Sequence, residues 1–150
     1  MWEGLQCPDL RVKKLQPKIN IMLQNLYPHL LGFHGLFRWV VLVMAVAAIV
    51  VALSGWRGTK PPSPNLRRFG LLFVIAMDIE LLAGLLLYFG ASPSLRSAFA
   101  AHSALMLLAV VCAHVGGACS RKARTDATKY RGAAIAWTIS LLLMLAGIPR

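Results

Sequence analysis

The chain has 150 residues, of which 58% are hydrophobic and only 14% are charged. This composition is too apolar for an ordinary water-soluble domain and indicates that much of the chain faces hydrocarbon. Lys and Arg number 16 against 5 Asp and Glu, but no RNA- or DNA-binding motif surrounds them, which argues against a nucleic-acid-binding protein.

Residues 1–21 differ from the rest of the chain because they carry mixed charge and no sustained hydrophobic period. We expect this segment to form a solvent-exposed N-terminal arm. It has no apolar core followed by a small-residue cleavage site, which argues against a signal peptide. Met22 begins a stretch that would itself make a natural start, so a second interpretation is that residues 1–21 come from a mis-assigned start site.

Four apolar runs, each long enough to cross a bilayer as a helix, occupy most of residues 22–150. They cover about 29–55, 69–90, 97–118 and 132–148. At 1.5 Å rise per residue the first reaches about 40 Å, which exceeds the ~30 Å hydrocarbon layer. Pro28 is placed to begin this first helix. The fourth run, at about 17 residues, lies at the short end of the permitted range.

The continuity of these runs decides the predicted fold class. A membrane β-barrel would show segments of about ten alternating residues, whereas these runs are apolar without interruption. Three prolines, Pro61, Pro62 and Pro64, prevent the first helix from continuing into the second. We therefore predict an all-α integral membrane protein, a four-helix bundle with up-down-up-down topology in residues 22–150.

Basic residues are divided unevenly between the two sides of the predicted bundle. Arg96 and Arg150 lie on one side, with four more on the N-terminal arm. Nine lie in the loops that follow the first and third spans, namely Arg57, Lys60, Arg67, Arg68, Arg121, Lys122, Arg124, Lys129 and Arg131. Because positively charged short loops stay cytoplasmic, both termini are predicted to be non-cytoplasmic.

Ionisable side chains within the predicted spans need a partner or a purpose, because each costs about 2.5–3.5 kcal/mol at the centre of a membrane helix. Arg38 of the first span and Glu80 of the second come to nearly the same depth, so we predict an ion pair or a hydrogen bond between them. Asp78 is then either protonated or a secondary partner of Arg38. An alternative for Arg38 is a side chain that snorkels to the outer interface beside Trp39.

Two histidines carry the sharpest functional hypothesis. His34 and His102 each lie about one turn below the outer boundary, on different helices that start from the same face. A bis-imidazole haem b needs this arrangement of two neutral nitrogens between apolar walls, with a polar rim for the propionates. Arg38, Arg96 and Ser97 are candidates for that rim. In the alternative interpretation, both histidines are interfacial residues that only form hydrogen bonds.

The remaining histidines have other expected roles. His114 lies about 18 Å deeper than His102, so the two do not belong to one site. We expect His114 to form a hydrogen bond across a close helix contact that Gly116 and Gly117 permit. His29, next to Pro28, is expected at the membrane interface.

Three segments together resemble a family of small bacterial four-helix membrane proteins that are often labelled cytochrome b-like. The segments are HGLFRW from His34, LLAGLLLYF from Leu81, and AFAAHSALMLLAVVCAHVGG from Ala98. The resemblance implies a b-type haem in the bacterial inner (plasma) membrane, without an established activity. The family usually has an uncharged polar residue where Glu80 stands, and a histidine can occupy the place of Asp78.

These patterns favour a membrane subunit of a redox or energy-transducing complex, with one haem b near the outer face for electron transfer. Its expected partners are the lipid bilayer and other membrane subunits. No nucleotide-binding loop or nucleophile-base set is present, so a non-catalytic subunit is favoured over an enzyme. The alternative is a haem-free accessory subunit that packs against larger subunits, lipids or pigments. A third interpretation is a metal or solute conduit that uses Asp78, Glu80 and His114.

Overall fold

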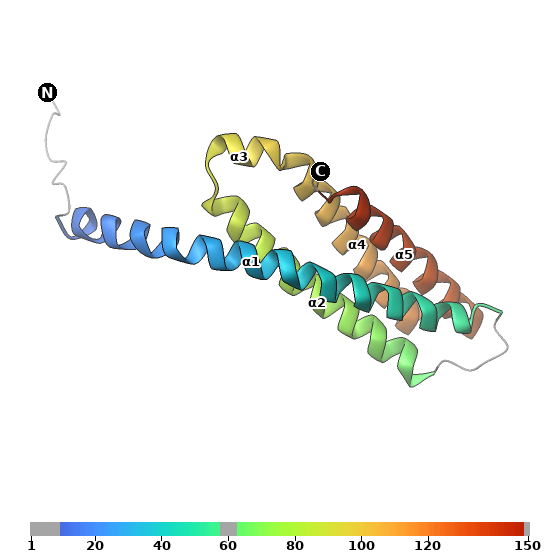
Figure 1. The fold of residues 1–150 in the computed structure, drawn as a ribbon. Helices are drawn as coiled ribbons and strands as arrows, with labels where there is room; N and C mark the ends of the chain where they lie inside the picture. Colours follow the sequence, from blue (N-terminus) through green and yellow to red (C-terminus); the bar gives the residue numbers. More distant parts are fainter. Residues whose placement is uncertain (1–9, 58–62, 149–150) are drawn as a thin grey trace, which may run out of the picture.

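The computed structural model describes the backbone of residues 10–57 and 63–148, and the side chains of 25–57 and 63–148. All regular structure in these ranges is helical, which confirms the predicted all-α class. The helices are α1 (Leu10–Ser54), α2 (Pro64–Gly90), α3 (Pro93–Ala98), α4 (Ala100–Lys122) and α5 (Asp126–Ala146), as Figure 1 shows.

Helix α1 is much longer than the predicted first span, with 45 residues. The predicted start at Pro28 is wrong, because the helix runs through this proline from Leu10. A proline inside a helix removes one backbone hydrogen bond and crowds the preceding turn, so α1 continues through Pro28 at a local energetic cost. Residues 10–21, predicted to form an exposed arm, therefore belong to this helix, and their side chains lie outside the described set.

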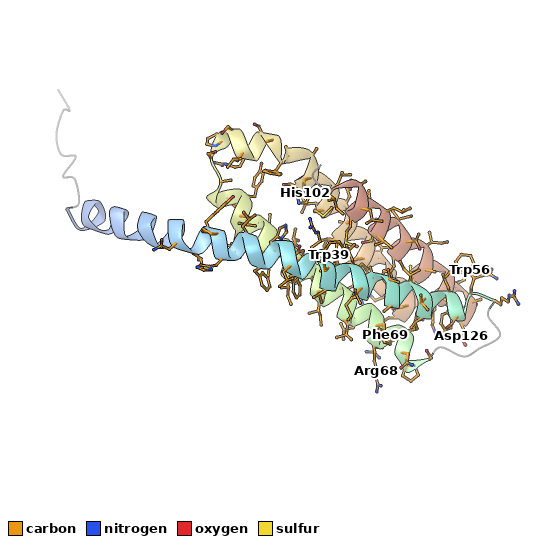
Figure 2. All side chains as sticks on the ribbon, viewed as in Figure 1. Trp39, Trp56, Arg68, Phe69, His102 and Asp126 are labelled. Carbon is orange, nitrogen blue, oxygen red and sulfur yellow. The ribbon has the colours of Figure 1, made fainter. Side chains whose placement is uncertain are left out.

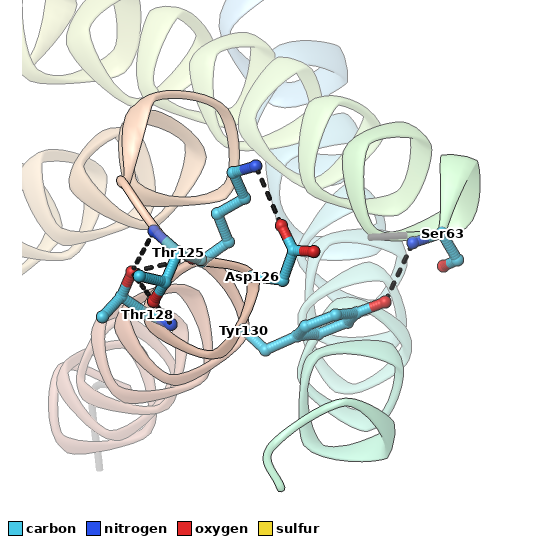
Figure 3. A network of polar contacts seen from close by, with 6 residues as sticks. Ser63, Thr125, Asp126, Thr128 and Tyr130 are labelled. Atoms are coloured by element: carbon cyan, nitrogen blue, oxygen red, sulfur yellow. Dashed lines mark hydrogen bonds and ion pairs between the residues drawn. The ribbon is translucent and has the colours of Figure 1, made fainter. Parts of the chain in front are cut away.

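Local capping explains why α2 and α5 begin earlier than predicted. Ser63 accepts a hydrogen bond from the backbone N–H of Leu66, and Pro64 occupies the first turn, so α2 begins at Pro64 rather than at 69. Thr125 and Thr128 form a reciprocal capping box (Figure 3), so α5 begins at Asp126 rather than at 132.

The turn predicted between the second and third spans is itself a short helix. Ser92 caps α3 through the backbone N–H of Leu95, and the helix ends at Ala98. Phe99 separates α3 from α4, so the predicted start of the third span at Ser97 is wrong. This break turns the chain, and it places α3 beside the start of α4 (Figure 1).

Three stretches of the described helices are long and apolar enough to cross a membrane: Asn25–Ser54, Pro64–Gly90 and Ala100–Lys122. The sequence predicted a fourth in α5. The first two turns of α5 carry Asp126, Lys129 and Arg131, which leaves a shorter apolar run than in the other three helices.

The helices pack through small residues. Helix α1 lies against α2 and α5, and α4 lies against α5 and α2. Alanines at the centre of these contacts are completely buried, among them Ala45, Ala48, Ala52, Ala109, Ala113 and Ala133. Small side chains let helix backbones approach closely. Large apolar side chains instead project outward along the helices, as the sticks in Figure 2 show.

One large residue, Trp137 of α5, fills the centre of the packed helices and is fully buried. Its Nε1–H donates to the Ala113 carbonyl oxygen at 3.1 Å, and its ring meets that of Phe73 edge-on, with centroids 6.4 Å apart. Gly70 of α2 and Gly116 of α4 lie against the indole, where a Cβ atom would overlap its ring. The tryptophan is therefore accommodated only because both neighbours lack a side chain.

Backbone contacts join the ends of three helices on the side opposite α3. The backbone N–H of Ser63 donates to the Tyr130 hydroxyl at 2.9 Å (Figure 3). Nearby, Arg131 Nε donates to the Trp56 carbonyl oxygen at 3.0 Å. These bonds bring the end of α1, the start of α2 and the start of α5 together. Many basic residues of the two predicted cytoplasmic loops thus lie at one end of the structure.

We expect Gly116→Ala to destabilise the protein by about 1–3 kcal/mol, because the added methyl group overpacks the site of Trp137. Gly32→Ala is the matched control, since a Cβ at Gly32 meets nothing within 4 Å. The control should leave stability unchanged or raise it by up to about 1 kcal/mol through helix propensity. Unfolding in mixed detergent micelles, followed by circular dichroism, measures both. Equal stability of the two variants would contradict the packing described for Trp137.

Candidate functional site

A cavity of about 550 Å³ lies among α1, α2, α3 and α4, at the end of the structure where α3 lies. Its volume falls within the ~300–1,000 Å³ typical of ligand pockets. Its walls are mainly apolar and include Leu31, Leu81, Leu85, Met106, Leu107 and Val110. Histidine, arginine and glutamate side chains also line it: His34, Arg38, Glu80, Arg96 and His102. A mostly apolar cavity with a few converging polar groups is the usual form of a binding site.

The two histidines predicted to share one depth lie together in this cavity. The ring centroids of His34 on α1 and His102 on α4 are 6.4 Å apart, and the ring planes are at 89°. Figure 2 shows His102 near the start of α4, facing the space beside α1. Two histidines that are 68 residues apart in the sequence (102 − 34) thus lie next to each other.

His102 is oriented by the backbone at the end of α5. Its Nδ1 lies 2.6 Å from the carbonyl oxygen of Gly147. A carbonyl oxygen can only accept, so Nδ1 is the donor, and in the neutral ring Nε2 carries no proton. Histidines that ligate metals usually donate their other ring N–H in this way, to a backbone carbonyl or a carboxylate. Within the described part of the chain, no hydrogen bond engages Nε2 of His102.

His34 faces a carboxylate instead. Its Nδ1 lies 3.2 Å from Oε1 of Glu80, and these side chains are only 21% and 13% exposed. The distance is that of an ion pair, but the N–H direction is too bent for a hydrogen bond, and Nδ1 has no other partner among the described residues. Gly84 provides room for the ring, because a Cβ there would lie 3.3 Å from His34 Cε1.

The predicted ion pair between Arg38 and Glu80 is wrong. Glu80 contacts His34, which precedes Arg38 by one helical turn on the same face of α1 and therefore reaches the carboxylate. The Arg38 guanidinium lies over the ring of Trp39, 5.6 Å from its centroid. Arg38 Nε and Glu80 Oε2 are both buried without a hydrogen-bond partner among the described residues.

Of the other two rim candidates, Arg96 lines the cavity and Ser97 does not. Arg96 extends from α3, and its Nε is buried without a partner in the described structure. The Ser97 hydroxyl donates to the carbonyl oxygen of Ser94 in its own helix at 2.8 Å. Arg38 and Arg96 are thus the cationic groups that the described residues direct toward this cavity.

A second histidine and carboxylate meet outside the cavity. Nε2 of His114 lies 2.9 Å from Oδ1 of Asp78, which joins α4 to α2. The expected hydrogen bond of His114 to another helix is confirmed, and Gly117 lies beside Val74 of α2. The expected part of Gly116 in this contact is wrong, because Gly116 lies against Trp137 of α5. Sequence reasoning missed Asp78 as the partner. Asp78 and Glu80 point to different sides of α2 because they are two residues apart on a helix.

The donor set limits which metals the cavity suits. Among the residues that the structure describes, no three His, Cys, Asp or Glu side chains are grouped to hold a metal ion. Two imidazoles alone suit an iron whose remaining ligands come from its own macrocycle. Comparison with family models, curated proteins and solved structures finds no match to this chain, so the functional argument rests on these residues.

We predict that neutral His102 is the Nδ1–H tautomer, because the Gly147 carbonyl accepts from Nδ1. ¹⁵N NMR of histidine-labelled, haem-free protein in lipid nanodiscs can measure this, with the resonance assigned by its loss in His102→Gln. The exposed His29 is the internal reference and should show the tautomer mixture of a free imidazole. An Nε2–H tautomer at His102 would contradict the geometry of the site.

Proposed function

We propose that this chain is a multi-pass membrane protein that holds one haem b between His34 and His102 and transfers electrons within a redox or energy-transducing complex. The observation that carries the proposal is the meeting of two imidazoles in a mainly apolar cavity. The Gly147 carbonyl oxygen accepts from Nδ1 of His102, which leaves Nε2 of that neutral ring available as a ligand, and the Glu80 carboxylate lies against Nδ1 of His34.

The ring separation supports haem ligation. The ring centroids of His34 and His102 lie 6.4 Å apart, so the two imidazoles are close enough for both to hold one bound group. Bound haem b supplies reversible one-electron chemistry at its iron. The chain supplies the two ligands, their orientation by Gly147 and Glu80, and an apolar cavity that keeps water from the ligands.

The unpartnered cations support the same occupant. Arg38 and Arg96 each have a buried Nε without a partner among the described residues. Such groups are costly unless a bound acceptor satisfies them. Haem carries two propionates, and arginines are well suited to bind carboxylates. We therefore assign Arg38 and Arg96 to the propionates.

The membrane part of the proposal rests on the exposed surface. Large apolar side chains are exposed on the surface of the isolated chain along every long helix. Examples, each 58–72% exposed, are Leu36, Val43, Leu82, Leu86, Val111 and Leu142. A monomeric soluble protein rarely exposes apolar patches of this extent. We propose that α1, α2, α4 and α5 cross the bilayer in an up-down-up-down bundle. The fourth and shortest of these helices, α5, packs against α1 and α4.

The basic residues in the loops between the helices set the proposed orientation in the membrane. The basic loops after α1 and α4 lie in the cytoplasm and both termini lie outside, so the haem site is near the outer face. The resemblance to cytochrome b-like membrane proteins fits a subunit of the bacterial inner membrane. The competing proposal is a haem-free accessory subunit that packs against larger subunits, lipids or pigments, and the exposed apolar surface fits it equally well.

A reduced-minus-oxidised visible spectrum of the purified protein separates these proposals. We expect a b-type α band with one haem per chain. His34→Ala and His102→Ala should each abolish at least nine-tenths of the band, on the order of what loss of an axial ligand removes. His29→Ala is the matched control, because His29 is exposed on the same helix as His34, and it should keep the band.

Folding must be shown independently, by circular dichroism and size-exclusion chromatography of every variant. A well-folded wild-type protein with a featureless spectrum, after expression with excess haem, would refute haem binding and favour the accessory subunit. A band that survives in the double variant of His34 and His102 would refute the assigned ligands.

A further inference from the structure

The pair formed by Asp78 and His114 is unusual because it is polar, central and exposed. Its side chains are 45% and 52% exposed, whereas the pair of Glu80 and His34 is mostly buried. Asp78 lies near the middle of α2, and His114 lies in the second half of α4. Ionisable groups inside a membrane almost always face a protein interior or a water-filled cavity. In the proposed bilayer, another protein surface must therefore cover this pair.

The surroundings of the pair form one continuous apolar face, here called the α2–α4 face. Residues at helical spacing from Asp78 on α2, and from His114 on α4, are exposed and aliphatic. They are Leu71, Ile75, Leu82 and Leu86 on α2 and Leu107 and Val111 on α4, each 46–62% exposed. The α2–α4 face is thus aliphatic apart from a single polar pair.

The hydrogen bonding of the pair indicates what covers it. In hydrocarbon, a form of the pair with no net charge is favoured. Besides the proton on Nδ1 of His114, such a pair holds one more proton, which lies between Oδ1 of Asp78 and Nε2 of His114. Whether this proton is on Oδ1 of Asp78 or on Nε2 of His114, Nδ1–H of His114 stays a donor and Oδ2 of Asp78 stays an acceptor. Among the described residues, neither atom has a partner. The exposed pair therefore offers one donor and one acceptor.

We propose that a second copy of this chain docks on the α2–α4 face across a two-fold axis. A two-fold interface brings the same patch of both copies together, so the patch must be complementary to itself. The pair meets this requirement, because Nδ1–H of each His114 can donate to Oδ2 of Asp78 in the other copy. The two hydrogen bonds satisfy all four free groups, while the aliphatic residues pack around them. This proposal rests on membrane insertion, and not on haem binding.

Energy transfer between donor- and acceptor-labelled full-length protein in phosphatidylcholine and phosphatidylglycerol vesicles tests the proposal. We expect wild-type chains to dimerise reversibly as the lipid-to-protein ratio falls. The double variant Asp78→Leu with His114→Leu should raise the dimer dissociation constant about tenfold, since two interhelical hydrogen bonds are lost. Replacing both groups with aliphatic ones leaves no unpaired polar atom that would impair folding.

Thr138→Leu is the matched control, because it removes an exposed polar side chain from α5, away from the α2–α4 face. It should leave the dissociation constant unchanged. Wild-type chains that stay monomeric in vesicles at all densities would overturn the proposal, even where a different membrane protein binds the face. A dissociation constant that the double variant leaves unchanged would overturn it as well. Protein that fails to enter the vesicle membrane would instead refute the insertion on which the proposal rests.

Discussion

Each carboxylate of α2 is paired with a histidine of a neighbouring helix, and much of the structure depends on these two contacts. Glu80 faces His34 of α1 inside the cavity, and Asp78 bonds His114 of α4 on the outer face. Because the two carboxylates are two residues apart, they point to different sides of α2. The contacts therefore hold α2 between α1 and α4 and orient both imidazoles. Without them, α2 would carry two unpaired acids within the apolar stretch that follows Arg68.

The cavity follows from the ends of the helices rather than from their middles. Tightly packed alanines and Trp137 close the centre, whereas α3 and the last turn of α5 surround an open space at one end. The Gly147 carbonyl contributes to this site because α5 ends beside the start of α4, where it accepts from His102. The architecture thus separates a rigid packed region from a region with room for a ligand and two unpaired arginine nitrogens.

Sequence reasoning predicts the features that depend on composition and helical periodicity. Long apolar runs predict the helices, and equal depth predicts that His34 and His102 meet. It fails where two side chains compete for one partner. His34 and Arg38 lie on the same face of α1, and Glu80 contacts His34 rather than Arg38. It also misses backbone partners such as Gly147, since every residue has a carbonyl and only the fold selects one. The helical segment before Pro28 was missed because proline usually marks a helix start.

The proposed membrane insertion accounts for the exposed aliphatic side chains along the long helices. Washing isolated membranes with alkaline carbonate, which strips peripheral proteins, tests this most directly. An integral protein of this structure should remain in the membrane pellet after ultracentrifugation and should enter solution only with detergent. Recovery of the chain in the supernatant as a detergent-free, folded monomer would show that water is its solvent, which would contradict membrane insertion.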